Sequence, residues 1–220
     1  MSDLLDFDYS KIKKDFLNLF YLRMLELGFD KKKSWTFYKT TVFGKVGVGL
    51  SIWKNYNCMD VAPSVSIRID ELENLLDGFR DSILNEKESS SFSVGANIGN
   101  IRSGVYRKWQ IYYESEIKEN IDEIVEMVKI VGLPYIEKYS NPQEMFSGLI
   151  NPKTGWLLSP MIAYRIQKAL ALTFVLDDYD LFLKESLEGE KILINHPQGK
   201  VKEFLLLRDW LNIKFKEKQA

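Results

Sequence analysis

The sequence has only one cysteine, Cys58, and one histidine, His196, among its 220 residues. A single cysteine excludes an internal disulfide, and one soft ligand of each type is too few for a zinc site. No apolar run reaches the roughly 18 residues needed to span a membrane, and Met1-Ser2-Asp3 lacks the basic-then-apolar order of a signal peptide. We therefore expect a cytoplasmic protein that has no membrane partner, no metal and no cofactor.

An excess of either charge is also missing, since 30 basic and 31 acidic residues give a net charge of −1. A nucleic-acid-binding protein usually has a basic excess, so nucleic acid is not expected as a partner. One local cluster could still bind single-stranded nucleic acid by phosphate contacts and stacking. It comprises Lys31, Lys32, Lys33, Lys39, Lys45 and Lys54 near Trp35, Tyr38 and Trp53. The simpler interpretation is a solvated turn and a protected strand edge.

Cys58 and His196 could form a nucleophilic pair only if the fold brought them together beside an orienting group such as Asp60 or Asn195. Nothing in their spacing supports this arrangement. A lone cysteine is more often a small, partly buried side chain. The sequence therefore identifies no catalytic residue, and whether the chain is an enzyme stays open.

The first part of the chain alternates between helical and strand patterns. Period-3.6 spacing predicts helices over residues 10–27 and 70–79, and period-2 spacing predicts strands over 34–42, 46–53, 64–69, 91–99 and 105–113. Gly28 is placed to end the first helix, with Phe29 as its apolar contact. Gly44-Lys45 suits a tight hairpin turn, and residues 55–60 look irregular.

The second part is dominated by helical patterns. Residues 116–131 predict a helix that Gly132 and Pro134 end, residues 134–159 look irregular, and helices follow over 160–175, 179–187 and 200–215. The predicted fold class is α+β: an antiparallel sheet of about five strands packed on one face by helices, followed by a C-terminal helical group. The predicted domains are a sheet domain over 1–140 and a helical extension or small lobe over 156–220.

The predicted sheet has unlike faces. One face is apolar, and the other consists largely of glycine, serine and other polar residues, as is common for an antiparallel sheet with one free side. Two glycines on one face of a strand favour a close approach to the backbone by a packed helix, by an aromatic such as Trp53, or by a ligand or partner. The possible binding surface comprises Gly47, Gly49, Ser51, Trp53, Ser66, Arg68, Ser93 and Asn97.

Acidic residues recur on two predicted helices. They are Glu119, Asp122, Glu123 and Glu126 on one helix, and Glu71, Glu73, Asp77 and Asp81 around the other. Such a face could steer a basic partner by charge complementarity. A solvated helix face is the simpler interpretation.

The run Leu27-Gly28-Phe29-Asp30-Lys31-Lys32-Lys33, followed by Trp35-Thr36-Phe37-Tyr38-Lys39, resembles the opening of a family of small bacterial α+β proteins defined as a domain of unknown function. The resemblance covers residues 10 to about 150. It implies a turn from a first helix into an aromatic strand of an antiparallel sheet, and it implies no catalytic residues. Some similar small α+β proteins are thought to act as immunity proteins.

These observations predict a non-catalytic, protein-binding module of immunity or adaptor type that uses the small-residue sheet face or the acidic helix face. The alternative is an enzyme or small-ligand binder with a cleft between the polar sheet face and the C-terminal helices. Arg68, Asn97, Trp53 and Tyr112 would be among the residues lining that cleft. The sequence does not define the partner or the oligomeric state.

Overall fold

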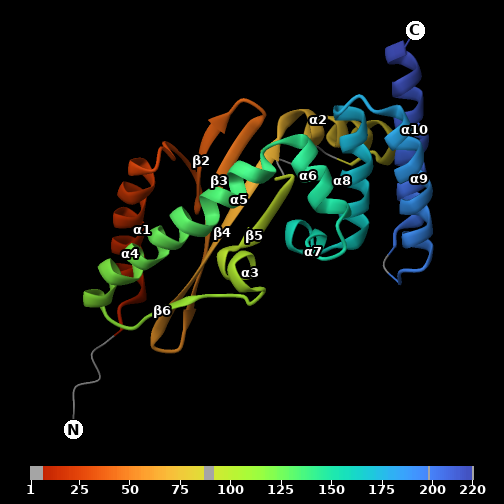
Figure 1. The fold of residues 1–220 in the computed structure, drawn as a ribbon. Coiled ribbons are helices and arrows are strands. Elements are labelled where there is room, and N and C mark those ends of the chain that lie inside the picture. Colours follow the sequence, from red (N-terminus) through yellow and green to blue (C-terminus); the bar gives the residue numbers. More distant parts are fainter. Residues whose placement is uncertain (1–6, 87–91, 198, 220) are drawn as a thin grey trace. The chain divides into compact units, whose positions relative to one another are not determined.

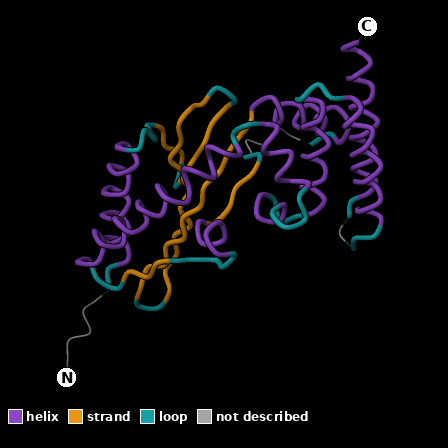
Figure 2. Tube along the Cα trace, viewed as in Figure 1, coloured by secondary structure: helices purple, strands orange, loops and turns teal. Residues whose placement is uncertain are grey.

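The computed structural model describes residues 7–86, 92–197 and 199–219 and shows an α+β fold (Figure 1). Its strands are β1 Lys31–Lys33, β2 Thr36–Thr41, β3 Gly44–Asn55, β4 Cys58–Ile69, β5 Val94–Asn97 and β6 Trp109–Ile111. Within the described part of the chain they form one sheet in the order β1-β2-β3-β4-β5, and β6 pairs with β4 (Figure 2). The predicted fold class is confirmed.

Helices make up most of the remaining described chain. They are α1 Tyr9–Glu26, α2 Asp70–Phe79, α3 Ile98–Ser103, α4 Ile117–Met127, α5 Leu133–Tyr139, α6 Pro142–Ile150, α7 Gly155–Leu158, α8 Ile162–Val175, α9 Tyr179–Ile194 and α10 Val201–Gln219. Short helical turns adjoin them: η1 Arg80–Leu84, η2 Glu114–Glu116 and η3 Val128–Gly132. None of the helices in the described residues is long and apolar enough to span a membrane.

The chain divides into two compact units. Unit 1 comprises Met1–Thr41, Val46–Ser66 and Ala96–Ile136; unit 2 comprises Val42–Lys45, Ile67–Gly95 and Glu137–Ala220. β3, β4, β5 and α5 contribute residues to both units. Each unit is described by itself below.

Unit 1 packs the apolar face of its sheet against helices. α1 and α4 pack against each other (Figure 1), and the Phe20 ring of α1 meets the Phe37 ring of β2 edge to face at 5.3 Å. Phe20, Phe37, Val48 and Val65 are fully buried. Gly132 lets the helical chain approach β4 closely, since a Cβ there would be 2.9 Å from Val65 Cγ1.

Unit 2 is mostly helical, and α8 packs against α2, α6, α9 and α10. Its core includes Phe182, Phe204 and Phe215. The Phe182 and Phe215 rings lie 5.1 Å apart. α9 and α10 approach closely at Gly189, where a Cβ would be 2.7 Å from Phe204.

The end of α1 follows the predicted rule. Gly28 has a φ of 80°, the Phe29 amide donates to Met24 O, and the Gly28 amide donates to Leu25 O. This pair of bonds is a Schellman motif, and the buried Phe29 supplies its hydrophobic contact.

The first predicted hairpin turn is two residues too late. The chain turns at Val42-Phe43, and Gly44 already begins β3. Gly44 has a φ of 149°, and a Cβ there would be 2.3 Å from Arg68 O. This glycine therefore permits a close backbone approach rather than a turn.

The segment predicted as irregular, residues 55–60, belongs mostly to strands. β3 extends to Asn55, Tyr56-Asn57 form the turn, and β4 begins at Cys58 and runs through Pro63. A proline is tolerated inside a strand where its missing N–H costs no ladder bond. Pro63 lies outside Met59–Val61, the part of β4 that pairs with β6, and its carbonyl accepts a side-chain hydrogen bond from Asn97.

Several later predictions are corrected. The strand expected over 91–99 is the shorter β5, because Asn97 caps α3 and ends the strand. Ser91 lies outside the described residues. The strand expected over 105–113 is the shorter β6. The helix predicted to end at Gly132 continues through a π-helical turn, and Pro134 lies in the first turn of α5. The predicted irregular region contains α6, which begins at Pro142 behind Asn141 as N-cap.

Candidate functional site

The predicted small-residue face exists in unit 1, where it follows β2, β3 and β4. Its residues there are Thr36, Gly47, Gly49, Ser51, Ser64 and Ser66, with Ser51 exposed and Gly47 buried. A Cβ at Gly47 would be 3.1 Å from Thr36 Cγ2 and 3.2 Å from Ser66 Oγ. The glycines therefore neighbour serine and threonine side chains on adjacent strands.

The surroundings of Gly49 bear on whether a packed helix, the Trp53 ring or a ligand approaches the two glycines. A Cβ at Gly49 would meet only Ser64 Oγ at 3.2 Å and Thr36 Oγ1 at 3.6 Å within 4 Å, among the described residues. Among the described residues, no helix atom and no atom of the Trp53 ring lies within 4 Å of that Cβ position. Two small hydroxyl groups are therefore the immediate neighbours of Gly49.

The same side of the sheet leads to a buried carboxylate, Asp60. Asp60 follows the alternation of Ser66 and Ser64 along β4 and is fully buried. It accepts hydrogen bonds from Lys108 Nζ at 2.6 Å, Asn55 Nδ2 at 3.0 Å and Gln110 Nε2 at 3.1 Å. Gln110 pairs with Asp60 across β6 and β4, which places both side chains on one face.

The environment of Asp60 holds it ionised. Burial acts to raise the pKa of this carboxyl, but the hydrogen bonds from Lys108, Gln110 and Asn55 together outweigh burial and lower it. The hydrogen bond to Asp60 likewise raises the pKa of Lys108. The Lys108 ammonium also lies 5.8 Å from the centroid of the Trp53 ring, so the cluster adjoins one of the predicted surface residues.

The thiol of Cys58 is unsuited to nucleophilic attack. Burial and the nearby Asp60 raise its pKa, which disfavours the reactive thiolate. Its Sγ lies 3.2 Å from Asn55 O and 3.9 Å from Asp60 Oδ1, and Gln110 Nε2 lies 3.7 Å from it. These contacts make Cys58 part of the Asp60 cluster. His196, the other residue of the nucleophilic pair considered from the sequence, belongs to unit 2 and Cys58 to unit 1.

Asn97, another predicted surface residue, has a structural role. Its Nδ2 donates to Pro63 O at 3.0 Å and to Arg107 O at 2.9 Å, and its Oδ1 accepts from the amides of Gly99 at 2.9 Å and Arg107 at 3.0 Å. These four bonds join the end of β5, the start of α3 and the chain before β6 to β4. Asn97 is 9% exposed and its polar atoms already have partners.

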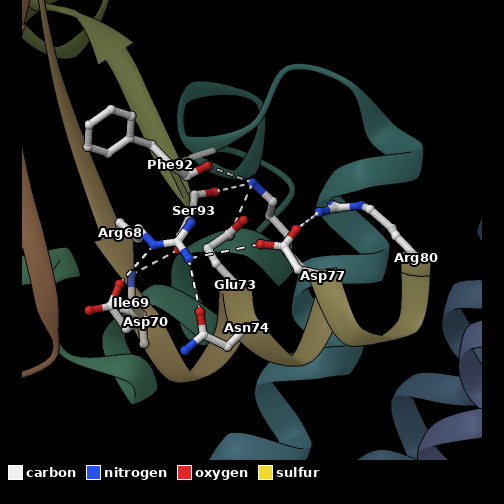
Figure 3. A network of polar contacts seen from close by, with 10 residues as sticks. Arg68, Ile69, Asp70, Glu73, Asn74, Asp77, Arg80, Phe92 and Ser93 are labelled. Carbon is white, nitrogen blue, oxygen red and sulfur yellow. Dashed lines mark hydrogen bonds and ion pairs between the residues drawn. The ribbon is translucent and has the colours of Figure 1, made fainter. Parts of the chain in front are cut away.

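Arg68 and Ser93 belong to unit 2, where they lie in a buried polar network (Figure 3). Arg68 donates to Asp70 at 2.8 Å and to Asn74 at 3.0 Å, and it lies 4.0 Å from Asp77. Ser93 Oγ accepts from the Ile69 amide at 3.0 Å. These groups connect β4, α2 and the start of β5, so Arg68 and Ser93 are not part of an exposed surface.

Lys168 completes this network from α8. Its ammonium donates to the carbonyls of Phe92 at 3.0 Å and Ser93 at 2.6 Å and lies 3.7 Å from the buried Glu73 carboxylate. Burial lowers the pKa of Lys168 despite the neighbouring carboxylate. Lys168 is not among the predicted site residues. Its one signal in the sequence is that it is a lysine within a largely apolar helical pattern.

Half of the eight residues on the acidic helix faces are paired or buried within the chain itself. Asp122 pairs with Arg23, and Glu123 pairs with Arg107 and accepts from Trp109 Nε1 at 2.8 Å. Around α2, Glu73 and Asp77 are buried. Asp77 pairs with Arg80 at 2.8 Å.

A search of protein-family models, of curated proteins and of solved structures finds no match for this chain. The resemblance to the bacterial α+β family therefore remains a prediction. Among the described residues, no three His, Cys, Asp or Glu side chains form a group that could hold a metal ion.

The Asp60 cluster makes stability depend on acid pH. A carboxyl whose pKa is lower in the folded than in the unfolded protein stabilises the fold above its unfolded pKa of about 4, and that stabilisation disappears as pH falls through the folded pKa. We expect Asp60→Asn to lower the free energy of unfolding at pH 7 by about 1 to 3 kcal/mol. The difference from the parent protein should shrink at pH 2 to 3.

Urea unfolding at both pH values measures this effect, and Asp30→Asn, which replaces an exposed carboxylate, is the control. An equal loss of stability for Asp60→Asn at both pH values would show that the charge of Asp60 does not matter.

Proposed function

We propose that the protein is a non-catalytic protein-binding module of adaptor or immunity type. Its docking surface is the small-residue face of unit 1, defined as Thr36, Gly47, Gly49, Ser51, Trp53, Ser64 and Ser66. The observation that carries the proposal is the immediate surroundings of Gly49: among the described residues, the atoms within 4 Å of a Cβ there are two small hydroxyl groups and include no helix or aromatic atom. Such a surface lets the backbone of a partner approach closely.

Trp53 supplies an anchor beside these small residues. It is 36% exposed, and tryptophan is enriched among the few residues that supply most of the binding energy of an interface. Beside Trp53, the Lys108 side chain is partly exposed, whereas its partner Asp60 is fully buried. The lysine is therefore the charged group of this pair that a partner would reach. A partner would therefore meet a flat, hydroxyl-bearing surface with one aromatic anchor.

Two observations favour this face over the other possibilities. The acidic face of α4 has Arg23 and Arg107 as internal counter-charges, which weakens its attraction for a basic partner. The groups that the enzyme alternative needs are also engaged, because Arg68 and Asn97 already have hydrogen-bond partners. The raised pKa of Cys58 supports a non-catalytic role as well.

The test is recovery and mapping of a protein partner. Pull-down from the native host should recover one stoichiometric protein, and calorimetric titration should then give its dissociation constant. Ser51→Arg, at an exposed site, should abolish binding by placing a long charged side chain on the flat face. Trp53→Ala should weaken binding by about 2 kcal/mol, roughly 30-fold.

Glu126→Lys on the exposed side of α4 is the matched control. It should leave the dissociation constant unchanged. If Glu126→Lys abolishes binding and Ser51→Arg does not, the partner uses the acidic helix face and the proposed surface is wrong.

A further inference from the structure

A second surface of unit 1 is a groove between α1 and the segment that leads into β2. It has a volume of about 390 Å³ and is lined by Tyr9, Ser10, Lys13, Lys14, Leu17, Asn18, Lys32 and Trp35. Lysines from two distant parts of the sequence thus meet around two aromatic rings. None of these residues belongs to the proposed docking surface, so this groove is independent of the proposed function.

Positive charge is concentrated around the groove. Residues 8–40 include eight lysines and arginines against four acidic residues, a net charge of +4. Because the whole chain carries −1, the remaining residues carry −5. The balanced overall charge therefore conceals a basic region, and local charge of this kind attracts anionic ligands.

The lysines of the groove are available to an anionic ligand. Among the described residues, no carboxylate forms an ion pair with Lys13, Lys14 or Lys32. By contrast, Lys11 on the same helix pairs with Glu114 at 2.5 Å. The groove therefore has three ammonium groups that form no ion pair with a carboxylate of the described residues.

Trp35 provides a stacking surface within this basic region. It is 39% exposed, and the Lys13 ammonium lies 4.5 Å from its ring centroid and 5.5 Å from that of Tyr9. The ring thus already interacts with a cation through its face. A planar base could take the place of the flexible Lys13 side chain, whose ammonium would then reach a phosphate.

We propose that this groove binds single-stranded nucleic acid, with one base stacked on Trp35 and phosphates held by Lys13, Lys14 and Lys32. Aromatic rings interleaved with lysines are the general means of binding a strand without reading its sequence. An acidic peptide would satisfy the lysines but would leave the Trp35 face unused. A strand satisfies both, and an open groove lets it continue beyond the stacked base.

The test is fluorescence anisotropy of labelled ten-nucleotide dT and U oligomers with the full chain. Binding should weaken with salt, and log K should fall against log salt with a slope of about −2 for three phosphate contacts. Trp35→Ala should weaken binding at least about fivefold, and Trp35→Phe should restore most of it. Lys13→Ala, Lys14→Ala and Lys32→Ala should each reduce the slope by about 0.7.

Two matched variants serve as controls. Trp156→Ala removes another partly exposed tryptophan, and Lys129→Ala removes an exposed lysine of η3 outside the groove. Neither should change the affinity or the salt slope. Circular dichroism verifies that each variant is folded.

Competing anions decide the identity of the ligand. The proposal requires that UMP, polyphosphate and a poly-glutamate peptide each compete far more weakly than the oligomer. Equal competition by polyphosphate or poly-glutamate would overturn it in favour of a purely electrostatic surface, and equal competition by UMP would replace it with a free-nucleotide site. Unchanged affinity for Trp35→Ala would overturn it too, as would the absence of oligomer binding at low salt.

Discussion

Replacing Lys168 with methionine should lower the free energy of unfolding by about 3 to 5 kcal/mol, because it removes a buried cation that faces a buried carboxylate. The Glu73 side chain is completely buried, and the Lys168 ammonium lies 3.7 Å from it. The substitution also removes two hydrogen bonds, to the carbonyls of Phe92 and Ser93. Urea unfolding followed by circular dichroism measures the loss.

A lysine in an exposed ion pair provides the control for this prediction. Lys200 pairs with Glu203 at 3.0 Å, and its side chain is 43% exposed, so Lys200→Met should cost less than about 1 kcal/mol. Combining Lys168→Met with Glu73→Leu should recover part of the stability, because the carboxylate that faced Lys168 is then removed together with the ammonium. Equal losses for Lys168→Met and Lys200→Met would contradict the assignment of a buried pair.

Replacing Asn97 with alanine should cost about 3 to 5 kcal/mol, because four backbone groups lose their partner at once. The affected groups are the carbonyls of Pro63 and Arg107 and the amides of Gly99 and Arg107. The substitution also removes the N-cap of α3. Thermal unfolding should show a lower midpoint, and hydrogen exchange at Gly99 and Arg107 should accelerate.

Asn120→Ala is the comparison for Asn97→Ala. Asn120 makes one side-chain hydrogen bond, to Glu116 O at 2.9 Å, and its loss should cost about 1 kcal/mol or less. If the two substitutions have similar effects, the four bonds of Asn97 are not what joins β5 and β6 to β4.

The elements with strong local signals could be predicted from the sequence. α1 ends just before Gly28, as predicted, because a left-handed glycine followed by a buried phenylalanine is itself a helix stop. α2 spans Asp70–Phe79 as predicted. Asp70 is its first residue and accepts a hydrogen bond from Arg68.

The errors lie where glycine or proline has more than one use. Gly44 and Gly132 were assigned to a turn and a helix end, but each allows close contact with a neighbouring element. Pro134 is predicted to end a helix and Pro142 falls in the region predicted as irregular, yet both lie in the first turn of a helix, where proline is favoured. Local sequence does not separate these uses, because the neighbour that requires them is distant along the chain.

The residues of the predicted binding surface were likewise predictable only in part. Strand alternation correctly placed Gly47, Gly49 and Ser66 on one face, and the structure adds Asp60 to that side through the same period. It could not show that Arg68 is buried among Asp70, Asn74 and Asp77, or that Asn97 joins three segments. Alternation determines the side of a strand, whereas packing determines what lies on that side.

The sequence by itself determined that this chain forms an α+β fold with a two-faced sheet and a helical C-terminal part. These features follow from periodicity and local caps, which act over a few residues. Only the tertiary structure decided that Lys13, Lys14 and Lys32 surround Trp35, and that Glu73 and Lys168 are buried together. Such groupings depend on contacts between residues far apart in the chain, which burial of the apolar core fixes and no local pattern records.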